Sequence, residues 1–297
     1  MIKKIITIMI VSILPLLAQE GFLEGVRAED LMLDRIEAVP VETAKEIENS
    51  GFDYWFEPVL SVAYSPNTTL IAEERTEKPG GRIIGVWIVD SATNTEKRII
   101  EGIAYDLKWS ADGKFLAFRK MVPKKELFHG RRVYGDGGLW LYNVETDEMQ
   151  PVPLGSYFEW SPQGNYLAGK HLDSTGLWAL AIYNAEREET KVLDRVLFFE
   201  PWNFCWSPDG EMLTYVVATK TSGHIECSPI ESEVFIINRD GTGKTQITYT
   251  MQPEILVKWL PDGKSIMVER FKEMPDPVTG GSDTEIVILK LKKRRRK

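Results

Sequence analysis

The sequence predicts an all-β fold, a β-propeller of five four-stranded antiparallel blades. Two observations indicate this: a turn motif recurs five times at near-constant spacing, and each copy is followed by short runs of alternating apolar residues. The length of 297 residues and the 43% hydrophobic content are sufficient for one large all-β domain with a buried core.

Each copy of the motif has an aromatic residue, Ser-Pro or a variant, an acidic or amide residue, and usually Gly. The five copies are Ala63–Asn67, Trp109–Gly113, Trp160–Gly164, Trp206–Gly210 and Trp259–Gly263. Their aromatic residues lie 45, 51, 46 and 53 residues apart, a period that fits one four-stranded blade. Pro sets the first turn position, and Asp-Gly supplies the left-handed backbone that closes a tight hairpin.

The Trp-Ser-Pro-Asp-Gly strand pair resembles the WD40-like repeat of TolB-type propellers, which also occurs in the propeller domain of prolyl oligopeptidases. The resemblance covers residues 59–291. It implies the propeller fold but no particular activity, since the motif residues build turns and blade packing. TolB-type propellers commonly have six blades, and TolB itself carries an α/β domain before them. Only residues 29–58 separate the predicted leader from the first repeat here.

The fifth repeat ends at Ile286–Leu291 without an evident fourth strand, and an unpaired edge strand favours aggregation. The segment Leu31–Val41 has the apolar spacing of the other outer strands. We therefore expect this N-terminal strand to complete the fifth blade and close the propeller, followed by a short helix over Val41–Asn49. A divergent sixth blade over Ala38–Phe56 is the alternative.

The N-terminus has the pattern of a secretory signal peptide. Lys3 and Lys4 precede the apolar run Ile5–Ala18, which is shorter than a membrane-spanning helix. Cleavage after Ala18 or after Ala28 fits the pattern. The predicted organisation is a leader over 1–28, the closing strand and helix over 29–58, the propeller over 59–291 and a basic tail over 292–297, in a periplasmic or secreted protein.

The formal charge of −8 argues against a nucleic-acid partner, because such partners require a basic surface. The basic tail could contact a membrane surface or the cell wall. Cys205 and Cys227 could form a disulfide in an oxidising compartment, a question that the sequence leaves open.

The face that carries the loops between the second and third strands of the blades is the predicted binding face. These loops vary most in length, with Met121–Gly137 and Thr219–Ser232 the longest, and binding usually resides in variable loops on a rigid scaffold. Charged residues also recur where the second strands end. The candidate ligand-binding residues are Arg75, Arg119, Lys120, Lys124, Lys125, Phe128, His129, Arg131, Arg132, Tyr134, His171, His224 and Arg270.

No catalytic pattern is present: the chain has no Gly-x-Ser-x-Gly elbow and no phosphate-binding glycine loop. The sequence therefore predicts a non-enzymatic scaffold without a metal or cofactor, which binds an envelope protein, a peptide or a glycan. The alternative is a propeller lyase, lactonase or glycan hydrolase with a metal near the central channel. The enzyme alternative rests on the three histidines of the chain, because all of them fall in second-to-third strand loops. They are His129, His171 and His224.

Overall fold

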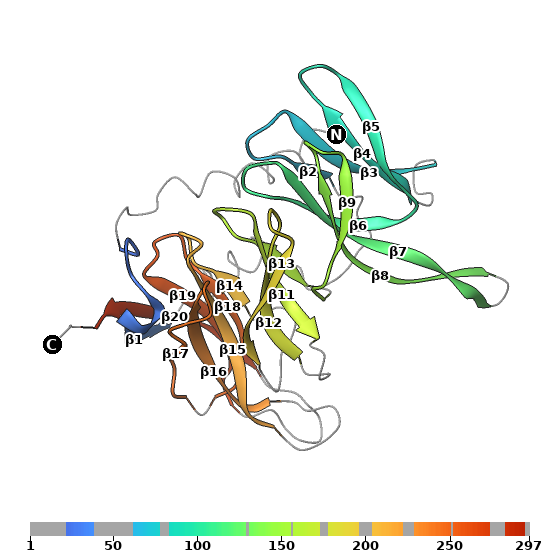
Figure 1. Cartoon of the computed structure of the whole chain (residues 1–297). Helices are drawn as coiled ribbons and strands as arrows, with labels where there is room; N and C mark the ends of the chain where they lie inside the picture. The colour runs from blue at the N-terminus through green and yellow to red at the C-terminus, as the bar shows by residue number, and fades with distance from the viewer. Residues whose placement is uncertain are drawn as a thin grey trace, which may run out of the picture. The chain divides into compact units, whose positions relative to one another are not determined.

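The computed structural model describes residues 22–38, 62–77, 83–128, 131–155, 157–172, 178–195, 204–221, 229–250, 252–273 and 283–294. These residues form five four-stranded antiparallel sheets, the blades of a propeller (Figure 1). The predicted fold class is confirmed. The chain divides into two units that are described separately below: Phe56–Val192, and Met1–Trp55 with Leu193–Lys297.

The first of these, the 56–192 unit, holds three blades. The first blade consists of β2 (Val62–Tyr64), β3 (Leu70–Thr76), β4 (Ile83–Asp90) and β5 (Thr95–Glu101). The second consists of β6 (Ala104–Trp109), β7 (Phe115–Phe128), β8 (Arg131–Asn143) and β9 (Glu148–Val152). The third consists of β10 (Phe158–Trp160), β11 (Tyr166–Leu172), β12 (Trp178–Asn184) and β13 (Glu189–Arg195), the end of which belongs to the other unit.

The second, the 193–297 unit, includes residues 1–55 and holds two blades. The fourth blade consists of β14 (Phe204–Trp206), β15 (Met212–Thr221), β16 (Pro229–Asn238) and β17 (Thr245–Gln246). The fifth consists of β18 (Glu254–Trp259), β19 (Ser265–Phe271), β20 (Thr284–Lys293) and β1 (Leu31–Ala38), which the short 3-10 helix η2 (Ala28–Asp30) precedes.

The N-terminal strand completes the fifth blade, as predicted. β1 pairs antiparallel with β20, from Leu31 opposite Lys293 to Ala38 opposite Val287. Lys293 and its neighbour Lys292, which the sequence assigns to the tail, are therefore the last residues of a paired strand. The predicted helix over Val41–Asn49 lies outside the described residues.

The repeated turn works as its residue types suggest. In the second blade the Ser110 hydroxyl donates to Asp112 Oδ1 at 2.7 Å, and the same carboxylate oxygen accepts the backbone N–H of Lys114 at 3.0 Å. Gly113 adopts a left-handed φ of 76°. These bonds close the hairpin between β6 and β7 and fix where β7 begins.

The motif tryptophans join successive blades. Trp109 Nε1 donates to the carbonyl of Ala63 in the first blade, and Trp160 Nε1 donates to the carbonyl of Lys108 in the second, both at 2.9 Å. Around these indoles lie two cores of fully buried side chains, such as Phe118 between the first two blades and Phe158 between the next two. The packing of Trp109 and Trp160 follows from the repeat, because both copies place the aromatic residue at the same strand position, whereas Tyr64 of the first copy is exposed.

Residues 22–28, which the sequence places in the leader, pack into the 193–297 unit. Leu23, Val26 and Ala28 are buried in its core, together with β18, β19 and β20. The Ala28 N–H donates to Asn238 Oδ1 at 2.9 Å. The predicted leader over 1–28 thus includes residues 22–28, which are packed into the core. A cleavage pattern in the sequence carries no information about such packing. None of the helices in the described part of the chain is long and apolar enough to cross a membrane.

Candidate functional site

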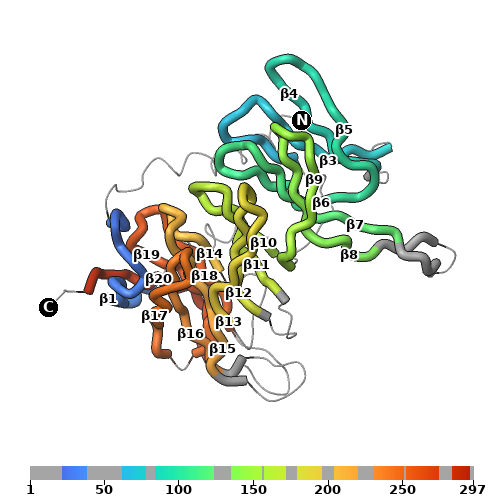
Figure 2. The backbone as a smooth tube through the Cα atoms, in the orientation of Figure 1, coloured from blue at the N-terminus to red at the C-terminus, as the bar shows by residue number. Residues whose placement is uncertain are grey.

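The second blade carries a two-stranded extension. β7 and β8 pair along their length, but β6 pairs with β7 only as far as Lys120, and β9 pairs with β8 only from Leu139. The stretch Met121–Gly137 between these points, called the arm below, is therefore a hairpin without neighbouring ladder strands in the described structure (Figure 2). The sequence predicts a loop here, and that prediction is corrected.

The base of the arm is fixed by Arg119. This side chain is 3% exposed; its Nε donates to the Tyr105 hydroxyl at 3.0 Å and its Nη2 pairs with Asp136. Burial opposes ionisation of Asp136, but the N–H of Gly138 and the Arg119 guanidinium outweigh it and hold the pKa of Asp136 below its ordinary value. Arg119 is thus a buried anchor for the arm and has no open face for a ligand.

Trp140 holds the other side of the base. Its Nε1 donates to the carbonyl of Gly137 at 2.9 Å, and the Lys120 ammonium lies 4.9 Å from the centroid of its ring. The Met121 N–H donates to the carbonyl of Ile103 at 2.9 Å. Lys120, like Arg119, therefore positions the arm, and the candidate ligand contacts lie further along it.

The predicted basic and aromatic residues of the long loop fall on the two strands of the arm. The backbone register places Pro123 opposite Tyr134, Leu127 opposite Arg132 and Phe128 opposite Arg131. The predicted residues on the arm strands are Lys124, Lys125, Phe128, Arg131, Arg132 and Tyr134. Residues 3 to 11 apart in the chain thus become neighbours across one hairpin. His129 lies outside the described residues, and so do the side-chain positions of Lys124 through Tyr134.

Three other predicted residues are engaged within their own blades. Arg75 pairs with Glu73 and Glu96, at 2.5 and 2.7 Å, and stacks over the Trp87 ring at 5.0 Å. Arg270 pairs with Glu285 at 2.9 Å. His171 Nδ1 lies 2.6 Å from the carbonyl of Pro153.

His224, like Cys227, lies outside the described residues. The convergence of the three histidines, on which the metal alternative depends, is accordingly not observed. In the described part of the chain, no group of three His, Cys, Asp or Glu side chains could hold a metal ion.

A buried carboxyl group at the start of the fifth blade escaped the sequence analysis. Glu254 is 1% exposed; its Oε2 accepts the Thr248 hydroxyl at 2.8 Å, while its Oε1 has no hydrogen-bond partner among the described residues. Burial, opposed by the Thr248 hydrogen bond and reinforced by the charge of Glu233, raises the pKa of Glu254 to about 8. No sequence signal identifies it, because Thr248 and Glu233 come from the preceding blade and its connection.

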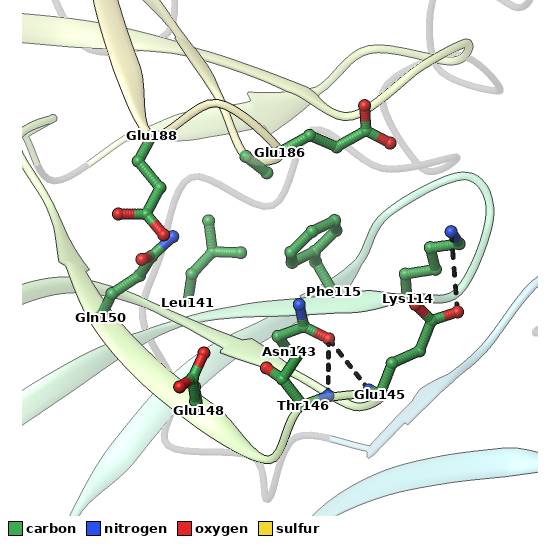
Figure 3. A pocket seen from close by; sticks show the side chains of 11 residues that line it. Lys114, Phe115, Leu141, Asn143, Glu145, Thr146, Glu148, Gln150, Glu186 and Glu188 are labelled. Carbon is green, nitrogen blue, oxygen red and sulfur yellow. Dashed lines mark hydrogen bonds and ion pairs between the residues drawn. The ribbon is translucent and has the colours of Figure 1, made fainter.

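A polar cavity of about 310 Å³ lies between the second and third blades (Figure 3). Its lining residues are Lys114, Phe115, Leu141, Asn143, Glu145, Thr146, Glu148, Gln150, Ala185, Glu186 and Glu188. They come from the start of β7, from the end of β8 and the start of β9 with the turn between them, and from the turn between β12 and β13. The cavity and the arm therefore lie at opposite ends of β7. Lys114 pairs with Glu145 at 3.6 Å, and the Gln150 amide lies 2.8 Å from the Glu188 carboxylate.

Solved structures give the clearest comparison. The tricorn protease matches with a TM-score of 0.51 at 12% identity, over 80% of this chain and 27% of that one. TolB from Acinetobacter baumannii matches at 18% identity with a TM-score of 0.39, over 79% of this chain and 54% of that one. The β-propeller domain of the Trilobed protease from Pyrococcus furiosus matches at 17% identity with a TM-score of 0.47, over 78% of this chain and 68% of that one.

These likenesses concern the fold alone, and the propeller architecture that the sequence resemblance implies is confirmed. No family model matches the chain, and no curated protein matches its sequence. The chain spans about a quarter of the length of the tricorn protease chain.

The prediction that the chain is not an enzyme is corrected by the same comparison. A protease is among the proteins with this architecture, so the fold gives no ground for excluding enzymatic activity. The sequence argument relied on the absence of a local catalytic pattern, and an active site assembled from several blades would not produce one. The described residues thus form five four-stranded blades of a β-propeller, with a basic two-stranded arm on the second.

Proposed function

We propose that this chain is an exported β-propeller that binds an anionic ligand of the cell envelope, a protein or a glycan, through the arm of the second blade. The observation that carries the proposal is the hairpin Met121–Gly137, which extends past the ladders of β6 and β9. Binding elements commonly extend from a rigid scaffold in this way.

Charge supports an anionic ligand. The arm contains four Lys or Arg residues (Lys124, Lys125, Arg131, Arg132) and two acidic ones, Glu126 and Asp136. Its formal charge is therefore +2, while the whole chain carries −8, which leaves −10 for the remainder. The sequence thus concentrates positive charge in the arm against an acidic remainder, and such a contrast guides the encounter with an anion and its orientation.

Charge reversal tests the arm directly. The variant Arg131→Glu/Arg132→Glu should bind heparin and poly-L-glutamate at least about tenfold more weakly than the parent chain in low salt, and the parent's affinity should fall as salt rises. The matched control is Arg187→Glu/Lys191→Glu, which changes the net charge equally at exposed positions in the third blade. Equal loss in both variants would show that net charge governs binding, and the arm would have no special role.

Export is supported by the N-terminal pattern, and the packing of residues 22–28 favours cleavage after Ala18 over cleavage after Ala28. Cleavage after Ala28 would remove Leu23 and Val26 from the core and break the ion pair between Arg27 and Asp240, whereas cleavage after Ala18 keeps both. Intact-mass measurement of protein recovered from the periplasm of a Gram-negative host should give a chain that begins at Gln19. An uncleaved chain retained in the cytoplasm would contradict export, and a chain that begins at Glu29 would contradict the packing argument.

Contact between the basic C-terminus and an anionic surface remains part of the proposal. Within this run, Lys292 pairs with Asp34 at 2.9 Å, and Arg294 donates to the carbonyl of Leu31 at 3.2 Å. Residues 295–297 lie outside the described structure. Any such contact therefore involves this last segment more than the residues that complete the fifth blade.

A further inference from the structure

The two strands of the arm each have one edge that faces away from the other strand. Along the blade itself these edges are covered by β6 and β9, but in the described structure neither ladder continues past Lys120 or Leu139. Uncovered strand edges expose backbone N–H and C=O groups that can pair with another extended chain, and natural proteins usually block them.

The β7 edge is blocked by proline. The Met121 N–H points to the β6 side, since it donates to the carbonyl of Ile103. Because the direction of backbone groups alternates along a strand, residue 123 presents its nitrogen on that same side, and Pro123 has no N–H to donate. An incoming strand would lose a hydrogen bond at the first position that it could use.

In the described structure, the interactions that close the β8 edge lie at its base. Trp140 Nε1 occupies the carbonyl of Gly137, and Asp136 Oδ1 accepts the N–H of Gly138 at 2.8 Å. Gly138 has a left-handed φ of 83°, which takes the chain out of regular strand geometry there. These caps end the β9 ladder, so the stretch Arg131–Gly135 is a separate edge that contains no proline.

We propose that the β8 edge from Arg131 to Gly135 binds an extended acidic peptide segment as an added strand. This inference rests on the proposed anion-binding function of the arm and names the ligand. Strand addition draws affinity from main-chain hydrogen bonds and specificity from side chains beside them. The consecutive residues Arg131 and Arg132 bring two positive charges to this stretch of β8, which suits an acidic partner.

A peptide fits this edge better than a glycan for a geometric reason. A β-strand edge offers donors and acceptors at the repeat of another polypeptide backbone, and a sugar chain does not share that repeat. Lys124 and Lys125 on β7 add positive charge to the same hairpin. The ligand class is therefore an acidic segment with alternating β-forming residues, such as an exposed acidic stretch of another envelope protein.

Two peptides of equal length and charge provide the test with the full chain. One contains four Glu-Val repeats and can form a strand; the other contains four Glu-Pro repeats and lacks every second backbone donor. The Glu-Val peptide should bind at least about tenfold more tightly, and its binding should slow amide hydrogen exchange in residues 131–136. Arg131→Glu/Arg132→Glu should abolish binding, and Arg187→Glu/Lys191→Glu should retain it.

Each other outcome is decisive. Equal affinity for the two peptides, without protection of residues 131–136, would overturn strand addition and leave the anion-binding function intact. Binding of heparin without binding of either peptide would identify a glycan ligand and overturn this inference. Failure of heparin and both peptides to bind would overturn the proposed function itself.

Discussion

Arg119 in the second blade and Glu254 in the fifth are both almost completely buried ionisable side chains, yet their environments differ. Arg119 has Asp136 beside it and a phenol oxygen as a second acceptor. The Glu254 carboxyl group accepts the Thr248 hydroxyl, and burial and the nearby carboxylate of Glu233 oppose its charge. The comparison teaches that the environment of a buried ionisable group decides its charge. Arg119 stays charged beside Asp136 and anchors a hairpin, whereas Glu254, where the fourth and fifth blades meet, binds a proton and is neutral.

The pH dependence of stability should separate the two sites most strongly. The pKa of Glu254 is about 8 in the folded chain against an ordinary value of 4.5, so the folded state binds a proton that the unfolded state releases between these values. The stabilisation is therefore complete below pH 4.5 and is lost as the pH rises through 8, by up to about 1.4 kcal/mol per pH unit.

Glu254→Gln should remove this dependence, because an amide cannot ionise and its oxygen can still accept the Thr248 hydroxyl. Urea unfolding at pH 5, 6, 7 and 8 measures it, with the exposed Glu101→Gln as the control. Parallel stability curves for the parent chain and Glu254→Gln would contradict a buried neutral carboxyl group.

At the arm base, the two partners of one ion pair should have unequal effects. Asp136→Asn leaves the Arg119 guanidinium buried without a counter-charge and should lower the free energy of unfolding by about 3 kcal/mol. Arg119→Met leaves Asp136, whose side chain is 56% exposed and can be hydrated, and should cost about half as much. Urea denaturation at pH 7 measures both, and equal or reversed losses would contradict the account of Arg119 as the buried member.

Substitution of two motif tryptophans should show a smaller difference in the free energy of unfolding. Trp109→Phe removes an indole donor and leaves the half-buried carbonyl of Ala63 without its bond, at a cost of about 1 kcal/mol beyond the change in packing. Trp259 is also buried, but its Nε1 has no partner among the described residues, so Trp259→Phe should lack that extra loss. Thermal unfolding of the two variants measures the difference, and a larger loss for Trp259→Phe would reverse the assignment.

The blades could be predicted because each motif residue acts locally. Ser110, Asp112 and Gly113 close their own hairpin, and their types imply that turn without reference to the rest of the chain. The closing strand could be predicted by counting strands in each repeat. The fifth repeat lacked an outer strand, and apolar and polar residues alternate in Leu31–Ala38 as they do in such a strand.

The arm could not be predicted in the same way. Pro123 and the glycines at 130, 135 and 137 are typical of loops in a sequence. A two-stranded hairpin without further ladder strands tolerates these residues, whereas a central strand would not. The roles of Arg119 and Glu254 depend on partners that only folding brings together, Asp136 across a hairpin and Thr248 across a blade connection. Residue type alone made Arg119 look like a ligand contact and gave no reason to select Glu254.

The most direct measurement replaces the arm. Val122 lies opposite Gly135, so residues 123–134 can be exchanged for a two-residue Asn-Gly turn, which suits a hairpin of this register and leaves Arg119 and Asp136 in place. Isothermal titration with poly-L-glutamate in low salt compares this variant with the parent chain. We predict that binding to the variant is lost while its circular dichroism and unfolding midpoint stay near those of the parent; a folded variant that binds with the parent's affinity would contradict the central claim.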